Sequence, residues 1–196
     1  MERIILWLKR FWDRFTGQPS SSTINSPPST SSSSSSSSSD TVQNQHYTYD
    51  VFISFRGPDT RYSFVDHLSS HLLRKGIFVF KDDHKLQKGE SISPQLLQAI
   101  YHSRLSIIVF SKNYASSTWC LDEMAAIASR KQLSNHPVFP IFYDVDPSHV
   151  RHQNGVYKND FVSHRSKFKN DRDKVREWQW AMTGLANSAG WDVRGK

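Results

Sequence analysis

The segment YDVFISFRGPDTR, Tyr49–Arg61, joins a short apolar run to a polar turn. The run Val51–Phe55 is apolar at consecutive positions, as expected for a strand that is buried on both faces of a sheet. The turn Arg56–Asp59 contains Gly and Pro, which are typical of chain reversals. The segment therefore predicts a buried strand, parallel to its neighbours, that ends in a polar loop.

Similar apolar runs and helical patterns alternate after this segment. Three further strands are predicted at Ile77–Phe80, Leu105–Phe110 and Val138–Tyr143. Helices are predicted around Phe64–Leu72 with Gly76 as the stop, from Ser93-Pro94 through Ile100, at Thr118–Gln132 and at Asp171–Ser188. A polar, His-rich connection fills the interval before the last helix, and no fifth strand is evident. This alternation predicts a flavodoxin-like, three-layer α/β fold, with a central parallel sheet flanked by helices.

Ligands of such sheets bind beyond the carboxyl ends of the strands. The loops after the four predicted strands should therefore meet at one edge, and functional residues should come from them. The polar and aromatic candidates in these loops are Arg56 and Asp59, Asp82, Asp83 and Gly89, Trp119 to Glu123, and Asp144 and Asp146.

The 196-residue chain divides into one domain with an N-terminal extension. We predict an amphipathic helix at 1–16, a disordered linker at 17–46, the α/β domain at 47–191 and a tail at 192–196. The linker includes nine consecutive serines, 31–39, and has little to bury.

The N-terminal segment MERIILWLKRFWDRF places apolar side chains at helical spacing with basic residues between them. Its longest apolar run, Ile4–Leu8, is far below the roughly 20 residues that span a bilayer. The segment is read as a peripheral membrane contact. An organelle transit peptide and a helix that docks on protein remain open alternatives.

Composition places the chain in a reducing compartment, because its single cysteine cannot form an internal disulfide. We expect a cytoplasmic protein, with organelle targeting by the N-terminal segment as the alternative. The net charge of +7 is scattered. It allows an anionic partner, but no basic motif with interleaved aromatics supports nucleic-acid binding strongly.

Four ordered blocks resemble the plant Toll/interleukin-1 receptor (TIR) domain of immune proteins. They are YDVFISFRGPDTR (49–61), FKDDHKLQKGESI (80–92), IIVFSKNYASSTWCLDEM (107–124) and PIFYDVDPSHVRHQNG (140–155). The resemblance implies an NAD glycohydrolase, or NAD nucleosidase, that signals in plant defence and cell death and is activated by self-association. NAD, or NADP, would be a substrate, and no cofactor or metal is expected. Because the chain ends soon after the domain, it looks like a TIR-only protein.

The resemblance also assigns residues. The catalytic glutamate of the family's Trp-Cys-Leu-x-Glu-Leu motif corresponds to Glu123. The resemblance implies that Arg56, Gly57 and Gly89 lie at the nucleotide site. By their chemistry, Trp119 could stack on a ring and Asp82 could shape its loop or sit near the ribose, and Phe55 completes the predicted NAD-binding set. Self-association contacts correspond to His67 and Gly190. Two departures are Pro58, where the family has an acid, and Met124, where it has leucine.

Other readings of the same residues are structural. Glu123 could be a first-turn helix acid that merely favours the helix dipole, and Asp122, about 100° around the helix, is the expected structural acid. Cys120 is read as a buried small hydrophobe rather than a nucleophile. His149, His152 and Asp146 form only a weak metal pattern, so a solvated loop is expected there.

Two functions remain after this reading. The first is NAD cleavage to nicotinamide and ADP-ribose or a cyclic ADP-ribose-type product, carried out by a homo-oligomer. The alternative is a non-catalytic scaffold that binds other TIR immune receptors. Glu123 alone does not separate them, because a scaffold could retain it.

Overall fold

The computed structural model describes residues 4, 6, 10, 47–81 and 93–195, and the chain forms two units, Met1–His46 and Tyr47–Lys196. In the first unit, the described residues Ile4, Leu6 and Arg10 are helical. The rest of the predicted N-terminal helix and the linker lie outside the described residues, and so does the loop that contains Asp82, Asp83 and Gly89.

The second unit is built on a parallel sheet of five strands in the order β2-β1-β3-β4-β5. Every neighbouring pair is parallel. The strands are β1 Tyr49–Phe55, β2 Val79–Lys81, β3 Ser103–Phe110, β4 Val138–Phe142 and β5 Trp191–Asp192. The predicted flavodoxin-like architecture is confirmed.

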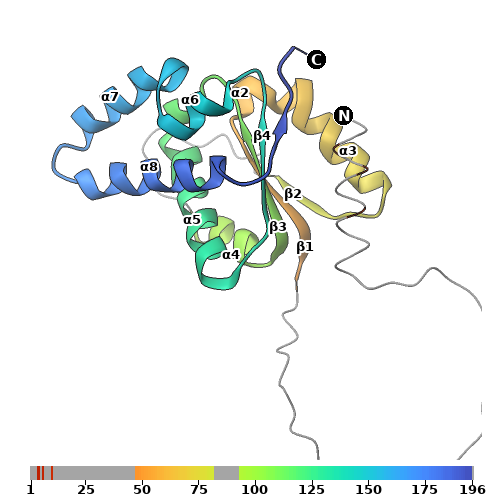
Figure 1. Cartoon of the computed structure of the whole chain (residues 1–196). Coiled ribbons are helices and arrows are strands. Elements are labelled where there is room, and N and C mark those ends of the chain that lie inside the picture. Colours follow the sequence, from red (N-terminus) through yellow and green to blue (C-terminus); the bar gives the residue numbers. More distant parts are fainter. Residues whose placement is uncertain (1–3, 5, 7–9, 11–46, 82–92, 196) are drawn as a thin grey trace, which may run out of the picture. The chain divides into compact units, whose positions relative to one another are not determined.

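Helices cover both faces of this sheet (Figure 1). On one side lie α2 Gly57–Thr60, the π-helical turn η1 Arg61–Val65, and α3 Asp66–Arg74. On the other side, α4 Pro94–Tyr101, α5 Thr118–Ser134 and α8 Arg172–Ala186 share a core with alternate residues of the strands. The fully buried core side chains include Phe52, Ile108, Leu121 and Trp178, so this layer fixes α5 against β1 and β3.

Local signals explain the helix ends. Ser93 caps α4 by accepting from the Leu96 amide, and Pro94 occupies its first turn. Ser117 caps α5 by accepting from the Cys120 amide at 3.3 Å. Gly76 has φ +75° just after α3, which confirms it as the stop.

The interval before α8 was predicted incorrectly. It forms α6 Pro147–His152, the 3-10 turn η3 Gly155–Tyr157, and α7 Lys158–Lys167 instead of a loop. Asp146 caps α6 by accepting from the Ser148 amide at 2.8 Å. The polar composition concealed these helices, because α7 buries only Phe161 and His164.

The fifth strand was missed because two residues are too short to show a pattern. Asp192 lies in β5, so the strand crosses the domain boundary predicted at residue 191. The fold continues beyond it: Val193 is buried, and Arg194 pairs with Asp146 at 2.5 Å. Gly190 precedes the strand, and a Cβ there would lie 2.6 Å from the Pro140 carbonyl oxygen. A glycine therefore allows the close approach to β4.

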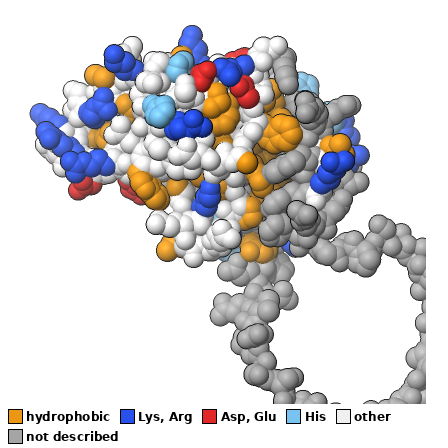
Figure 2. All heavy atoms as spheres, in the orientation of Figure 1, with side chains coloured by type: hydrophobic (Ala, Val, Ile, Leu, Met, Phe, Trp, Pro, Cys, Tyr) orange, Lys and Arg blue, Asp and Glu red, His pale blue; other side chains and the backbone are white. Residues whose placement is uncertain are grey.

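Basic side chains are spread over the visible face of the second unit. Figure 2 shows Lys and Arg at several separate places, including the end where α7 and α8 meet, with acidic side chains between them. This distribution agrees with the scattered charge expected from the sequence.

Candidate active site

The candidate site lies at the carboxyl ends of β1 and β3, next to the start of α5. Because β1, β3 and β4 are parallel, the segments that follow them begin at one edge of the sheet. Arg56 and Asp59 follow β1, and Glu123 comes from α5 after β3. The prediction that these loops share an edge is confirmed for the described segments.

Glu123 is a buried carboxylate, with 2% of the residue exposed. Its Oε2 accepts a hydrogen bond from the Ser54 hydroxyl at 2.6 Å, and its Oε1 accepts from the Trp119 indole at 2.7 Å. Trp119 is four residues earlier in the helix and therefore lies on the same face. Both carboxylate oxygens are thus held by donors from two elements of the fold.

The helix dipole is not the main support for this carboxylate. Ser117 is the N-cap of α5, so Glu123 is the sixth residue of the helix and lies beyond its first turn. Dipole effects fall off within that turn. The reading of Glu123 as a first-turn acid is therefore wrong, and the side-chain donors take the place assigned to the dipole.

Ser54 is itself hydrogen-bonded to Tyr114. Its hydroxyl is 2.9 Å from the Tyr114 hydroxyl, and Tyr114 donates to the Cys120 carbonyl oxygen at 3.0 Å. Ser54 and Tyr114 are completely buried. Burial, followed by the nearby Cys120 and Glu123, raises the pKa of Tyr114 well above its usual value, so the phenol stays protonated.

Cys120 is not suited to nucleophilic chemistry. Burial, with a smaller contribution from Glu123, raises the pKa of its thiol to about 12. The sulfur lies 3.6 Å from the carbonyl oxygen of Phe55 and belongs to the core cluster. A neutral thiol is a poor nucleophile, which supports the prediction of a buried small hydrophobe.

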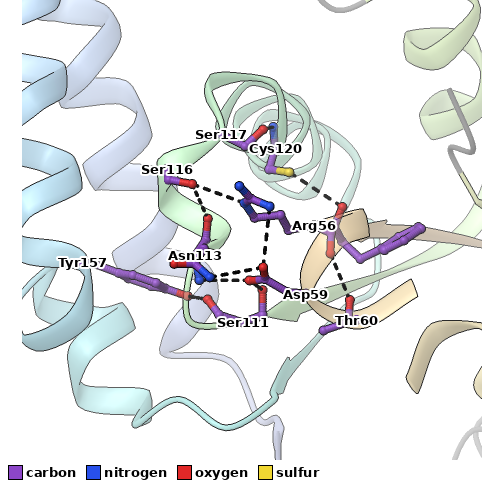
Figure 3. Close-up of polar contacts among 10 residues, drawn as sticks. Arg56, Asp59, Thr60, Ser111, Asn113, Ser116, Ser117, Cys120 and Tyr157 are labelled. Atoms are coloured by element: carbon purple, nitrogen blue, oxygen red, sulfur yellow. Dashed lines mark hydrogen bonds and ion pairs between the residues drawn. The ribbon is translucent and has the colours of Figure 1, made fainter. Parts of the chain in front are cut away.

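Arg56 belongs to a polar cluster at the same edge (Figure 3). Its Nε donates to the Ser116 hydroxyl at 3.2 Å, and its guanidinium pairs with Asp59 at 3.5 Å. Asp59 also accepts from the Ser111 hydroxyl at 2.6 Å and from the Asn113 backbone amide at 3.0 Å. The cluster therefore ties the turn after β1 to the segment after β3.

The two departures from the family motif fit this structure. Pro58 is exposed and lies in the first turn of α2, where proline is tolerated. Asp59, the next residue, keeps its place in the polar cluster. Met124 is fully buried in the core, where a flexible side chain of similar size to leucine packs readily.

Other predicted nucleotide-site residues surround the edge. Phe55 is buried, and the Arg61 guanidinium lies 5.1 Å from the centre of its ring. A Cβ at Gly57 would meet the end of the flexible Arg61 side chain at 2.9 Å. Trp119 is half-buried beside Glu123. Asp82 and Gly89 lie outside the described residues, so their roles stay predictions.

The predicted self-association residues lie away from this hydrogen-bond network. His67 is exposed on α3, and its carbonyl oxygen contacts His71 Nδ1 at 2.8 Å. Gly190 is also exposed, but its close approach to β4 gives the glycine a structural reason of its own. A role for either residue in assembly stays a prediction.

Two alternative acids have structural partners. Asp122 accepts from the Trp178 indole at 2.9 Å and from the Lys174 ammonium at 3.2 Å. These contacts join α5 to α8, which confirms Asp122 as the structural acid. Asp146 caps α6 and pairs with Arg194. Among the described residues, no group of His, Cys, Asp and Glu has the arrangement of a metal site.

The sequence reading missed Ser54 and Tyr114. A hydroxyl within the otherwise apolar run Val51–Phe55 was the available signal for Ser54, because a buried hydroxyl needs a partner. Tyr114 gave no such signal, since an aromatic residue between a strand and a helix is ordinary core composition.

Comparisons with known proteins agree with this fold. The family model for the TIR domain matches residues 48–196. Disease resistance protein RPV1 of Vitis rotundifolia is 53% identical over 146 residues, covering 74% of this chain and 10% of that protein. TMV resistance protein N of Nicotiana glutinosa is 46% identical over 147 residues, covering 75% and 13%. The chain thus matches only a small part of each relative.

A solved structure gives the same result. The TIR domains of the activated Roq1 resistosome, which directly recognises the pathogen effector XopQ, share 51% identity with this chain. The match has a TM-score of 0.70 and covers 76% of this chain and 90% of the other.

In the described part of the chain, no helix is long and apolar enough to cross a membrane.

Proposed function

This chain belongs to the TIR domain family, and from that premise we propose that it is an NAD glycohydrolase. Glu123 would be its catalytic residue. The observation that carries the proposal is a carboxylate held by Ser54 and Trp119 at the ligand edge of a parallel sheet. The products would be nicotinamide and ADP-ribose or a cyclic ADP-ribose-type molecule.

One carboxylate is sufficient for this reaction. The bond that breaks joins ribose C1′ to the cationic nicotinamide nitrogen, and its electron pair leaves with the nicotinamide. The leaving group departs neutral, so it needs no general acid, unlike the alkoxide of ordinary glycosides. Glu123 would stabilise the positive charge that develops on the ribose, or attack C1′ directly. Water, which loses a proton, would then form the new bond to C1′ in ADP-ribose, and an adenine nitrogen would form it in a cyclic product.

Neighbouring residues would bind the rest of the nucleotide. The Arg56 side chain lies at the same edge and is 26% exposed, so its guanidinium is suited to contact a phosphate. Trp119 presents a half-buried aromatic ring beside the carboxylate, where a planar base could stack. Phe55, Gly57, Asp82 and Gly89 complete the predicted NAD-binding set.

Access to the carboxylate requires a rearrangement, because only 2% of Glu123 is exposed. Association with a second copy would supply both the rearrangement and a wall that excludes water. The chain would therefore act as a homo-oligomer, and His67 and Gly190 are the proposed contact positions. Opening the edge only in the assembly would keep an isolated copy inactive.

We place this activity in plant immune signalling, with other TIR immune receptors as further partners. The support is the set of matches to plant disease resistance proteins. A cytoplasmic location with peripheral membrane contact through residues 1–16 accompanies the proposal. This part is tested by tagging the full chain and a chain that lacks residues 1–16 and comparing how much of each is recovered with membranes. Equal recovery would contradict a membrane contact through residues 1–16.

The test of the proposal is nicotinamide release from NAD and NADP by the full chain over a series of protein concentrations. Specific activity should rise with concentration and disappear in Glu123→Ala, with the thermal unfolding temperature nearly unchanged. His67→Ala should move the rise to higher concentration. Unchanged NAD at the highest concentration would favour the scaffold, and full turnover by Glu123→Ala would remove this residue from catalysis.

A further inference from the structure

A buried hydroxyl in the middle of β1 contacts the proposed catalytic carboxylate. Ser54 is fully buried, and its Oγ lies 2.6 Å from Glu123 Oε2. This distance falls within the short range of O–H···O⁻ hydrogen bonds. Burying a hydroxyl is unfavourable unless it is hydrogen-bonded, so the strand carries a polar group that the core itself does not require.

Counting hydrogens defines the direction of the network. Ionised Glu123 can only accept, so it takes the single hydroxyl hydrogen of Ser54. Ser54 must then accept in its 2.9 Å contact with Tyr114. The single hydroxyl hydrogen of Tyr114 is then shared between two acceptors, Ser54 Oγ and the Cys120 carbonyl oxygen, which lies 3.0 Å away. Tyr114 therefore orients the serine hydroxyl toward the carboxylate.

We propose that Ser54 is a positioning residue for Glu123, and that its hydroxyl, oriented by Tyr114, keeps the carboxylate ionised inside the protein. Hydrogen bonds to the charged form of an acid favour that form, and burial opposes it. Trp119 supplies the matching bond to the other oxygen. The catalytic part of this inference rests on the proposed function, whereas the effect on ionisation does not.

Two buried ionisable groups near Glu123 carry no charge near pH 7. Among the described residues, Tyr114 from η2 (Tyr114–Ser116) and Cys120 from α5 interact electrostatically with it. Both stay neutral near pH 7, because burial raises their pKa values. In the segment after β1, Arg56 lowers the pKa of the Cys120 thiol and Asp59 raises it.

The chain offers a conservative variant and a matched control. Ser54→Thr keeps a hydroxyl on a β-branched side chain that suits a strand, whereas Ser54→Ala removes it. Ser106 is also fully buried in a strand, and its hydroxyl lies 2.8 Å from His136 Nε2 instead of contacting the site. Ser106→Ala therefore controls for the general cost of deleting a buried serine hydroxyl.

The first experiment measures kcat and KM for NAD across pH in the full-length proteins. Activity requires ionised Glu123, so it is lost as pH falls. Ser54→Ala should move that loss about one pH unit higher, lowering kcat about tenfold on the acidic side with little change in KM. Ser54→Thr should restore the profile, and Ser106→Ala should not shift it. An unshifted Ser54→Ala profile, or equal loss at every pH, overturns the proposal.

A second experiment needs no enzyme activity. The indole N–H signal of Trp119 in ¹⁵N-Trp-labelled protein, assigned through Trp119→Phe, reports the ionisation of Glu123 through their hydrogen bond. Its pH midpoint should rise in Ser54→Ala and stay near wild type in Ser54→Thr and Ser106→Ala. If the full chain proves inactive on NAD, this shift still supports the ionisation role. If Ser54→Ala does not fold, a midpoint in Ser54→Thr that matches wild type supports the role, and a midpoint at least one pH unit higher overturns it.

Discussion

Asp122 and Glu123 are adjacent in α5, yet their carboxylates belong to different regions of the molecule. Each accepts from an indole: Asp122 from Trp178 and Glu123 from Trp119. The second donor differs. Asp122 accepts a hydrogen bond from the charged Lys174 ammonium of α8, whereas Glu123 accepts one from the neutral Ser54 hydroxyl of β1. Similar acids can therefore serve different purposes when the helix turns them toward different layers.

The consequence of this difference is a division between stability and chemistry. The Asp122 contacts join two helices, so their loss should weaken the fold. The Glu123 contacts aim a carboxylate at the edge where the loops after the strands meet, so their loss should affect a reaction there. The predictions below separate these two outcomes.

The largest expected change in stability is at Asp122. Asp122→Ala leaves the Trp178 indole and the Lys174 ammonium without this partner; Trp178 is completely buried, and the Lys174 side chain is 34% exposed. The free energy of unfolding should fall by about 2 kcal/mol, with NAD turnover per folded molecule within about twofold of wild type. Denaturant titration measures the first quantity, and an unchanged midpoint would show that the helix contact contributes little.

The two indoles allow a matched test of intermediate size. Trp119→Phe removes the donor to Glu123 but keeps an aromatic ring, and should lower kcat about tenfold. Trp178→Phe removes the donor to Asp122 and should lower the unfolding midpoint instead, with kcat retained. Loss of catalysis in both variants, or in neither, would break the distinction between the two faces of α5.

The smallest effect is expected at Cys120, whose sulfur lies against the Phe55 carbonyl oxygen at the end of β1. Burial raises the pKa of the Cys120 thiol to about 12, above that of an ordinary thiol, so the thiolate does not form between pH 7 and 9 in the folded protein. Alkylation by iodoacetamide should be slow over this range and rise sharply only on unfolding. Cys120→Ala should retain kcat within about twofold. Rapid labelling in the native state, or loss of turnover in Cys120→Ala, would reopen a thiol mechanism.

Much of the fold could be predicted because its signals are local. Runs such as Val51–Phe55 are long enough to identify strands, and Ser93-Pro94 marks a helix start. In contrast, β5 has two residues, and α7 presents mainly polar side chains. The position of β5 depends on its pairing with β4, and that of α7 depends on contacts such as the one between His164 and the Ala115 carbonyl oxygen; both partners are distant in the sequence.

The candidate site was predictable only in part. The motif around Trp119–Met124 indicated Glu123, and the spacing of neighbouring residues indicated that Asp122 points elsewhere. The contact between Ser54 and Glu123 spans 69 residues, and it forms because α5 packs on β1. The family motif therefore pointed to the acid, and only the packed sheet shows the hydroxyl that contacts it.

The central claim is that Glu123, and not Asp122, performs the chemistry. The most direct measurement compares nicotinamide release by Glu123→Gln and Asp122→Asn, each a neutral substitution of nearly equal size, at a concentration where wild-type turnover is at its plateau. The account predicts a loss of about 1,000-fold for Glu123→Gln and activity within about twofold of wild type for Asp122→Asn. Equal activity in the two variants, or the reverse order, would contradict it.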